Sequence, residues 1–466
     1  MKKIEVVFIP SPGVGHLIST LEFANLLINR NNRLNITVLV INFPKTVEKQ
    51  TNYSLTESEN LHVINLPQTT THVPSTSDVG NSISALVETQ KSNVKQAVSN
   101  LTGTLAAFVV DMFCTTMIDV ANELGVPSLV FFTSGVAFLG LMLHLHTIWE
   151  QQDTELLLQQ DELDIPSFAN PVATNTLPTL VLRKEWESSF IKYGNGLKKA
   201  SGIIVNSFHE LEPHAVRSFL EDPTLRDLPI YPVGPILNPK SNVDSDDVIK
   251  WLDDQPPSSV VFLCFGSMGT FDEEQVREIA LAIERSGVRF LWSLRKPQPQ
   301  GTMVPPSDYT LSQMLEVLPE GFLDRTANIG RVIGWAPQVQ VLAHQATGGF
   351  VSHCGWNSTL ESIYYGVPIA TWPLFAEQQT NAFELVRELK IAVEIALDYR
   401  LEFDIGRNYL LDADKIERGI RGVLDKDGEV RKKVKEMSQK SRNVLLEGGS
   451  SYTYLGQLID YITNQV

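Results

Sequence analysis

The stretch GGFVSHCGWNSTLES, residues 348–362, gathers polar and reactive side chains around a glycine turn. A histidine next to a cysteine raises the possibility of a cysteine hydrolase or a metal site. The adjacent side chains of His353 and Cys354 do not face each other, however, and no orienting partner for a base is evident. One imidazole and one thiol are also too few ligands for a metal. Neither kind of site is favoured, and Cys354 is expected to be a small buried side chain.

A binding site suits the same stretch better. The strand FVSH runs into Gly355, and the helix expected after it has Asn357 and Ser358 in its first turn, where side chains and backbone N–H groups point at a bound anion. Glu361 lies on the same helical face. A carboxylate there can accept hydrogen bonds from sugar hydroxyls.

Three other turns that follow apolar strands carry residues that could do chemistry. His16 begins a helix after PSPGV, where the helix dipole favours a neutral, basic imidazole, although a structural role is the alternative. Asp111 ends AAFVVD and could cap the next helix or orient His16. The turn CFGSMGT, residues 264–270, could present backbone N–H groups and the Ser267 hydroxyl to a phosphate, or be a plain turn.

These turns require a scaffold of parallel strands and helices, because ligands collect at the carboxyl ends of such strands. Short apolar runs alternate with stretches of helical period, such as the amphipathic HLISTLEFANLLINR, which predicts an α/β fold with parallel sheets. The expected strands are 4–9, 36–41, 107–111, 128–132, 202–206 and 230–233, followed by strands that begin near 259, 289, 330, 347 and 367.

The chain of 466 residues is too long for one ordinary core. Around 231–247 it changes to YPVGPILNPKSNVDSDD, which indicates a linker between two α/β units. The proline-rich segment 296–308 is expected to be an exposed loop, and the last fifty residues are expected to be helical.

Charge and composition exclude several classes of partner. A net charge of −16 argues against a nucleic acid or an anionic membrane surface. Three distant cysteines fit a reducing compartment. The most apolar segment, 129–143, is too short to span a membrane and is expected to be a buried strand and helix. We therefore predict a cytoplasmic protein without membrane insertion, and we expect a monomer.

The 44 residues 335–378, WAPQVQVLAHQATGGFVSHCGWNSTLESIYYGVPIATWPLFAEQ, resemble the signature box of plant UDP-dependent glycosyltransferases of family 1. The resemblance extends to PSPGVGHL, VVDMFC and FGSMGTF, and so covers essentially the whole chain. It implies a GT-B fold, with two facing Rossmann-like domains and an interdomain cleft. The acceptor domain would be 1–240 joined by the C-terminal helix 451–466, and the UDP-sugar domain would be 241–450.

The resemblance also implies roles for individual residues. His16 would take the proton from an acceptor hydroxyl, and Asp111 would stabilise the resulting imidazolium, although the local pattern alone favours a structural role for His16 and helix capping for Asp111. Glu377 stands where the family commonly has aspartate, and Gln378 favours glucose. The implied UDP-sugar ligands are Trp335, Ala336, Gln338 and Glu361 for uridine, Ser267, His353, Asn357 and Ser358 for the diphosphate, and Trp356, Glu377 and Gln378 for the sugar.

The resulting prediction is an inverting glucosyltransferase that uses UDP-glucose and gives a β-O-glucoside of a small hydrophobic acceptor, a phenolic such as a flavonoid or stilbene. No metal is expected, and the D-x-D triplets at 244–246, 412–414 and 425–427 are interpreted as chance and capping. The acceptor pocket is expected to be lined by Phe113, Phe132, Phe138, Leu141, Phe190 and Phe375.

Two other functions are alternatives. An NAD-dependent oxidoreductase would need a third glycine in GVGHLI and an acidic residue after the second strand, where NFPKTVEKQ offers only Glu48. A nucleotide-sugar-binding protein without catalysis should lack His16 or Asp111, and both are present.

Overall fold

A computed structural model gives the fold of the chain. It describes residues 3–43, 58–68, 79–150, 159–183, 186–237, 246–298, 305–402 and 406–466.

The chain divides into two compact units, each described by itself. The first unit comprises Met1–Pro171, Leu180–Asn238 and Asn443–Val466, and the second comprises Val172–Thr179 and Pro239–Arg442. The sequence predicts one domain over 1–240 with 451–466 and the other over 241–450. That assignment stays a prediction. The structure adds that eight residues inside the first range belong to the second unit.

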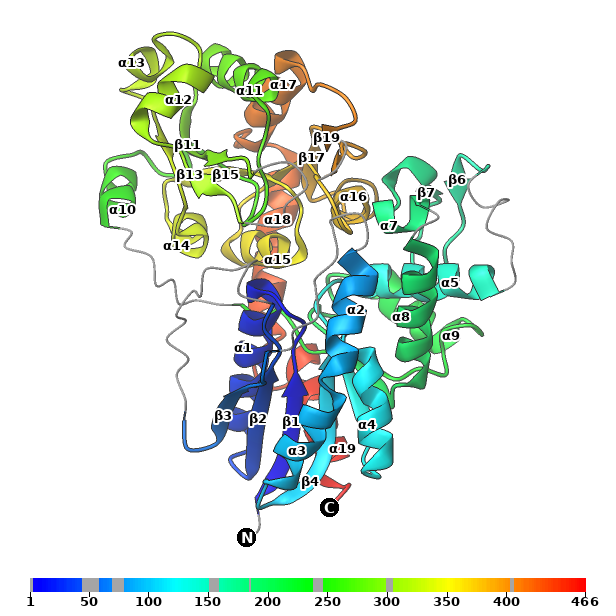
Figure 1. Cartoon of the computed structure of the whole chain (residues 1–466). Helices are drawn as coiled ribbons and strands as arrows, with labels where there is room; N and C mark the ends of the chain where they lie inside the picture. Colours follow the sequence, from blue (N-terminus) through cyan, green and yellow to red (C-terminus); the bar gives the residue numbers. More distant parts are fainter. Residues whose placement is uncertain are drawn as a thin grey trace. The chain divides into compact units, whose positions relative to one another are not determined.

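The first unit is built on a seven-stranded parallel sheet with the order β3-β2-β1-β4-β5-β8-β9 (Figure 1). Its inner strands are nearly continuous apolar runs because helices cover both faces of such a sheet. The strands are β1 Ile4–Ile9, β2 Leu34–Val40, β3 Leu61–Asn65, β4 Thr104–Asp111, β5 Ser128–Phe132, β8 Gly202–Val205 and β9 Ile230–Pro232, with the short β6 Glu162–Leu163 outside the sheet. Six of the seven were expected, and β3 was not.

Helices of the first unit bury apolar faces against this sheet. In α1, Ala24 and Leu27 join the core, as the amphipathic pattern predicted, and Phe23 joins it as well. The apolar segment 129–143 forms β5 and the buried helix α5, also as expected. The helices are α1 Val14–Arg30, α2 Val79–Thr89, α3 Lys91–Ser99, η2 Thr115–Met117, α4 Ile118–Glu123, α5 Val136–Glu150, α8 Glu187–Lys199, α9 Pro213–Glu221 and α19 Ser450–Thr463, and α7 Thr179–Leu182 spans the junction of the two units.

The C-terminal helix α19 completes the core of the first unit. Leu455, Leu458, Ile459 and Ile462 pack in the same cluster as β1, β2 and α1. The Ser451 hydroxyl donates to the carbonyl oxygen of Gly234 at 2.6 Å. The end of the chain therefore stabilises the sheet that the start of the chain forms.

The second unit contains a six-stranded parallel sheet with the order β14-β11-β10-β15-β16-β17. Its strands are β10 Val260–Cys264, β11 Arg289–Ser293, β14 Gly330–Ile333, β15 Thr347–Ser352, β16 Ile369–Thr371 and β17 Ala392–Glu394, and shorter strands are β7 Val172–Ala173, β12 Arg295–Lys296, β13 Ser307–Asp308, β18 Leu401–Glu402 and β19 Gly406–Arg407. Its helices are η3 Thr174–Thr176, α10 Asp246–Asp253, α11 Glu273–Ser286, α12 Leu311–Val317, α13 Phe322–Thr326, α14 Gln338–Ala343, α15 Trp356–Tyr365, α16 Gln378–Phe383, η5 Glu384–Glu388, α17 Ala413–Val423 and α18 Glu429–Asn443.

The expected loop 296–308 is partly ordered into strands. Its two ends form β12 and β13, which pair antiparallel, and residues 299–304 lie outside the described part of the chain. The expectation of a plain loop is therefore corrected at both ends. The final fifty residues are largely helical, as α18 and α19.

The segment Val172–Thr179 is held in the second unit by the buried Arg400. The guanidinium of Arg400 donates to the Thr179 hydroxyl at 3.0 Å and to the carbonyl oxygens of Asn175, at 2.7 Å, and Leu177. The Thr380 hydroxyl, on α16, donates to the carbonyl of Thr176 at 3.0 Å. The chain thus leaves the first unit for eight residues and then returns to it.

Among the described helices, none combines the length and the apolar character that crossing a bilayer would require.

Candidate active site

The first half-site joins His16 to Asp111. Strands β1 and β4 pair in parallel with Ile9 opposite Val110, so the turn after β1 lies beside the end of β4. The Nδ1 atom of His16 is 2.8 Å from Oδ2 of Asp111. The Asp111 side chain is fully buried, whereas 30% of the His16 side chain is exposed. One partner is thus fixed inside the unit, and the other presents its ring at the surface of the unit.

Asp111 is oriented by a second hydrogen bond. Its Oδ1 atom accepts from the backbone N–H of Phe113 at 3.0 Å, which leaves Oδ2 to accept from His16. Because an ionised carboxylate only accepts, Nδ1 of His16 carries the proton and Nε2 carries the lone pair. This tautomer is the one a general base needs. The sequence left orientation of His16 and helix capping open for Asp111, and the distance favours orientation.

Aromatic side chains flank this pair. The Phe113 ring meets the His16 ring edge-on, with centroids 5.6 Å apart, and Tyr193 on α8 meets Phe113 at 5.2 Å. The Thr133 hydroxyl, after β5, lies 3.4 Å from Nδ1 of His16. Sequence reasoning missed Tyr193 and Thr133. The TSG turn after a strand was a signal for Thr133, but no pattern pointed to Tyr193.

The residues expected to line an acceptor pocket lie in different surroundings. Phe113 contacts His16, whereas Phe132, Phe138, Leu141 and Phe190 are buried in the interior of the first unit. Among them, the rings of Phe132 and Phe138 pack against each other, and Phe190 packs against Trp149. The sixth residue, Phe375, is half-buried and belongs to the second unit.

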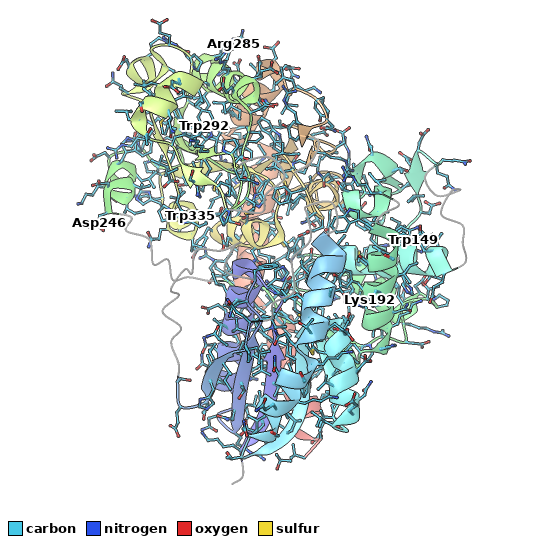
Figure 2. The ribbon with its side chains drawn as sticks, viewed as in Figure 1. Trp149, Lys192, Asp246, Arg285, Trp292 and Trp335 are labelled. Atoms are coloured by element: carbon cyan, nitrogen blue, oxygen red, sulfur yellow. The ribbon has the colours of Figure 1, made fainter. Side chains whose placement is uncertain are left out.

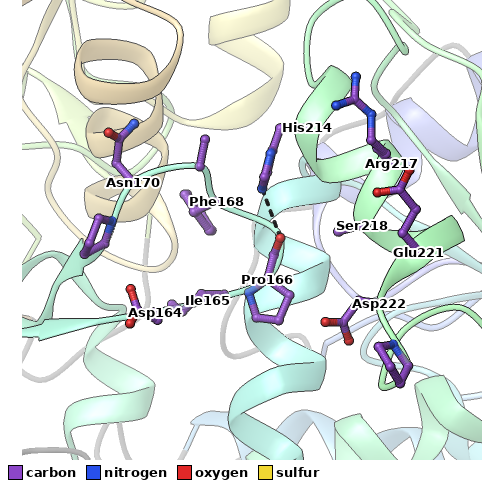
Figure 3. Close-up of a pocket in the computed structure, with 13 residues that line it drawn as sticks. Asp164, Ile165, Pro166, Phe168, Asn170, His214, Arg217, Ser218, Glu221 and Asp222 are labelled. Carbon is purple, nitrogen blue, oxygen red and sulfur yellow. Dashed lines mark hydrogen bonds between the residues drawn. The ribbon is translucent and has the colours of Figure 1, made fainter.

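A hollow of about 550 Å³ in the first unit lies away from this pair, between residues 164–171 and α9 (Figure 3). Its lining mixes Asp164 and Glu221 with Arg217, and the His214 ring lies 3.1 Å from the carbonyl oxygen of Pro166. Neither His16 nor Asp111 lines it. This hollow is therefore not the site at which His16 and Asp111 act, although it is large enough for a small molecule.

The second half-site is assembled at the carboxyl ends of β10 and β15. These strands pair in parallel with Cys264 opposite Ser352, which brings the turn 265–269 beside the turn 353–355. The His353 ring fills the space between Gly266 and Gly355, since a Cβ at either glycine would lie 2.6 or 2.4 Å from Nε2. Both positions must therefore be glycine for the imidazole to lie in this turn.

His353 is held neutral by its surroundings. Only 8% of the residue is exposed, and burial lowers the pKa of its imidazole to about 4. Its Nδ1 atom is buried and has no hydrogen-bond partner among the described residues. A buried polar atom of this kind is expected where a ligand or water completes the site. Ser267, on the facing turn, is exposed.

Three side chains join the starts of α14 and α15. The amide nitrogen of Gln338 donates to Ser358 Oγ at 2.9 Å and to Glu361 Oε2 at 2.7 Å. Burial raises the pKa of the Glu361 carboxyl to about 7, although the hydrogen bond from Gln338 opposes this shift. Asn357, in the same first turn, is half-buried. The expected ribose and phosphate ligands are therefore close together.

Trp335, labelled in Figure 2, is 48% exposed, whereas the neighbouring Ala336 is buried. The guanidinium of Arg295 lies 4.9 Å from the centroid of the Trp335 ring. A large apolar ring that remains accessible beside a cation is suited to stacking on a planar ligand.

The expected sugar ligands lie at the start of α16 and α15. Gln378 is buried, and its amide oxygen accepts from the backbone N–H groups of Leu374, at 2.9 Å, and Phe375, at 3.1 Å. Glu377 is half-buried and precedes α16, and Trp356 is buried at the start of α15. The oxygen of Gln378 thus shapes its own turn, and its amide nitrogen is the end suited to a ligand.

Comparisons with known proteins identify the family to which the chain belongs. Residues 233–398 match the family model described as UDP-glucoronosyl and UDP-glucosyl transferase. A relative from Fragaria ananassa, the putative UDP-glucose flavonoid 3-O-glucosyltransferase 3, is 53% identical over 99% of this chain and 100% of its own length. The chain belongs to the plant UDP-glycosyltransferases. It is therefore an enzyme that transfers a sugar from a UDP-sugar.

Other relatives agree with this assignment. The anthocyanidin 3-O-glucosyltransferase 1 of Manihot esculenta is 50% identical to this chain. The alignment covers 96% of this chain and 99% of the Manihot protein. A transferase structure from Siraitia grosvenorii in complex with UDP aligns with a TM-score of 0.87 at 46% identity, over 99% of this chain and 100% of its own. A Medicago truncatula structure complexed with UDP-glucose aligns at 0.86 and 40% identity, over 99% and 98%. The predicted GT-B fold class is confirmed.

Cys354 and the aspartates of the D-x-D triplets are the other reactive residues that the sequence raised. The described ones have structural roles in this UDP-glycosyltransferase. Cys354 is fully buried at a φ of 62°, and burial raises the pKa of its thiol, so the cysteine is not a nucleophile. Asp412 caps α17 through the N–H of Lys415, and Asp425 accepts from the N–H of Asp427. Of the first triplet, residues 244 and 245 lie outside the described ranges. Within those ranges, no group of three His, Cys, Asp or Glu residues could hold a metal ion.

Proposed function

We propose that this enzyme moves glucose from UDP-glucose to a hydroxyl of a small hydrophobic phenol, a flavonoid or a stilbene, and forms a β-O-glucoside. The observation that carries the proposal is the 2.8 Å contact between His16 and the buried Asp111, which suits a general base. The names of the Fragaria and Manihot relatives support flavonoid acceptors. A Phytolacca americana relative, 32% identical, in complex with pterostilbene supports stilbenes.

His16 acts on the acceptor. Its Nε2 atom takes the proton from the phenol as the phenolic oxygen attacks the anomeric carbon, and Asp111 stabilises the imidazolium that forms. The new carbon–oxygen bond forms as the bond from the anomeric carbon to the diphosphate breaks, and the electron pair leaves with UDP. Attack opposite the leaving group converts the α-linked donor into a β-glucoside.

The second unit binds the donor. Trp335 stacks on uracil, the backbone of Ala336 pairs with the edge of the base, and Gln338 and Glu361 hold the ribose. Exposure of the Trp335 ring and the hydrogen bond between Gln338 and Glu361 support these roles. This unit is thus the UDP-sugar domain of the pair, and the first unit is the acceptor domain.

The diphosphate binds at the turns after β10 and β15. Ser267, His353, Asn357 and Ser358 donate hydrogen bonds to it, together with N–H groups at the start of α15. His353 does so as a neutral imidazole, in keeping with its lowered pKa. Because the leaving diphosphate gains charge, donors held in place lower the barrier without a metal ion.

The sugar hydroxyls are held by Trp356, Glu377 and Gln378. The amide oxygen of Gln378 is bound to backbone N–H groups, so its amide nitrogen donates to a sugar oxygen. The carboxylate of Glu377 accepts from two neighbouring hydroxyls, as glucose presents them.

The acceptor ring packs against Phe113, which already contacts His16, and against Tyr193. Phe132, Phe138, Leu141 and Phe190 support this wall from the interior of the unit. The role of Phe375, which belongs to the donor unit, stays a prediction. The enzyme acts as a cytoplasmic monomer, and its three buried, unbridged cysteines are in keeping with a reducing compartment.

Turnover of UDP-glucose with a panel of flavonoids, stilbenes and terpenoid alcohols tests the proposal. The expected products are phenolic β-glucosides, identified by the NMR coupling of the anomeric proton, at a rate that a chelator does not change. Products with an α linkage, or transfer to terpenoid alcohols alone, would refute it. Binding of UDP-glucose without turnover of any acceptor would favour the non-catalytic alternative.

A further inference from the structure

A second hollow of the donor unit lies at the opposite end of the sheet from the nucleotide half-site. It has a volume of about 370 Å³, and Ser258, Thr347 and Val367 line it where β10, β15 and β16 begin. The proposed donor ligands follow the carboxyl ends of the same strands. Since β15 has six residues, the two places are about 20 Å apart. The hollow is therefore distinct from the donor site.

The charged side chains that line this hollow are cationic. Arg431, Lys435 and Arg442 come from one face of α18, and no aspartate or glutamate is among the lining residues. His344 also lines the hollow; its Nδ1 atom accepts from the N–H of Ala346, and its Nε2 atom lies 3.1 Å from Oδ1 of Asp253. Three cations thus converge on one hollow in a chain whose net charge is −16.

Arg431 is held rigidly at the base of the hollow. Only 7% of the residue is exposed, and its guanidinium donates to the carbonyl oxygens of Asp425 at 3.0 Å, Gly348 at 2.8 Å and Val423 at 2.6 Å. These carbonyl acceptors are neutral, and the nearby Asp425 carboxylate offsets the charge of the guanidinium only in part. Burial accordingly lowers the pKa of the guanidinium, a cost that a bound anion would relieve.

The other two cations are more accessible. Arg442 donates to the carbonyl oxygen of Tyr364 at 3.0 Å and lies over the ring of the same tyrosine. Lys435 is exposed and makes no hydrogen bond or ion pair within the part of the chain that the structure describes. The hollow therefore combines one fixed guanidinium with two cations that can close on a ligand.

We infer that this basic hollow binds a small soluble molecule that carries a phosphate group. Guanidinium groups match phosphate oxygens in pairs, and the lysine adds a mobile positive charge. The volume suits a phosphate ester with a short organic part, at the lower end of small-molecule sites.

Calorimetric titration of the full-length protein with inorganic phosphate and with glycerol 3-phosphate tests this inference. Saturating UDP is present throughout, so that the diphosphate site is filled. The ionic strength is held constant within each titration, and the titration is repeated at higher salt. We expect one phosphate per chain, and weaker binding as salt is raised. Arg431 is left intact because its three carbonyl contacts support the fold.

The test variant is Lys435→Gln with Arg442→Gln, and the matched control on the same helix is the exposed Lys440→Gln, which does not line the hollow. The double variant should weaken phosphate binding by at least about tenfold, while UDP affinity and Tm stay close to those of the wild type. The control should bind phosphate normally.

Three results would overturn the inference. One is the absence of phosphate binding to the UDP-saturated wild type at millimolar concentration. Another is equal phosphate affinity of the double variant and the wild type. A third is flotation with phosphatidic acid vesicles that depends on Lys435 and Arg442 while neither soluble phosphate binds, which would assign the hollow to a lipid headgroup.

Discussion

Replacing Asp111 with asparagine should nearly abolish transfer although the side chain keeps its shape. The amide oxygen can still accept from the N–H of Phe113, as Oδ1 does at 3.0 Å. The amide NH2 group then faces Nδ1 of His16, where Oδ2 now lies at 2.8 Å. Nδ1 must accept this hydrogen bond, so the imidazole proton moves to Nε2. An Nε2 atom that carries a proton cannot take one from the acceptor.

The size of the effect follows from the role of the base. General base catalysis contributes about 10² to 10⁴ in rate, which corresponds to about 3 to 5 kcal/mol of the barrier. We expect kcat to fall about 10³-fold, with little change in the KM for UDP-glucose, whose ligands belong to the second unit. Asp111→Ala should be less severe, because water can enter and leave the tautomer unforced. His16→Ala combined with Asp111→Asn should cost little more than either change alone.

Initial rates with two acceptors separate this mechanism from simple misfolding. One phenol should have a pKa well above the assay pH, and the other should be largely ionised at that pH. An ionised phenol needs no base, so the loss in Asp111→Asn should be much smaller for it. Thermal unfolding and calorimetric UDP binding serve as controls. A variant within about threefold of the wild type on the weakly acidic phenol, or equal losses on both phenols, would refute the reasoning.

The remaining predictions concern the second unit. Burial raises the pKa of Glu361 from 4.5 to about 7, so the nucleotide-free protein should lose about 3 kcal/mol of unfolding free energy as the pH rises between these values. Thermal unfolding of Glu361→Gln should lack this dependence on pH. Donor affinity should rise with pH through about 7 in the wild type, as the carboxylate forms to accept the ribose hydroxyls, and should be flat in Glu361→Gln. Trp335→Ala should weaken UDP binding by about 1 to 3 kcal/mol in calorimetry with little change in Tm, because the ring is half exposed; unchanged binding would exclude stacking. Arg400→Ala leaves the carbonyl oxygens of Asn175 and Leu177 without their donor and should make the segment 172–179 sensitive to limited proteolysis; a cleavage pattern like that of the wild type would contradict its anchoring role.

The inner strands could be predicted from the sequence because parallel strands covered on both faces are continuous apolar runs. Two of the edge strands, β3 and β17, could not, although the edge strands β9 and β14 were expected. In β3, LHVIN alternates and is largely exposed, and β17 has only three residues, so neither presents a long apolar run. Tertiary pairing with β2 and β16 defines them instead.

The sequence predicted the site as two sets of residues at strand ends. It did not predict the distances and contacts between these residues. The sequence placed His16 and Asp111 each after an apolar strand, yet only the pairing of β1 with β4 makes them neighbours. The raised pKa of Glu361 arises from burial, and its hydrogen-bond partner Gln338 lies 23 residues earlier in the chain; local patterns report neither. Tyr193 lies in a helix whose spacing gives it no distinguishing signal.

The excursion of Val172–Thr179 into the donor unit limits how chimaeric enzymes can be assembled from relatives. A donor unit grafted as 239–442 alone would leave Arg400 and Thr380 facing a foreign segment in place of their own hydrogen-bond partners. An acceptor unit expressed without α19 would expose to water the core residues of β1, β2 and α1 that lie in the same cluster as Leu455, Leu458 and Ile462. Exchange of sugar specificity between such enzymes should therefore succeed when both segments of the donor unit, 172–179 and 239–442, are transplanted together, rather than after a single cut in the linker.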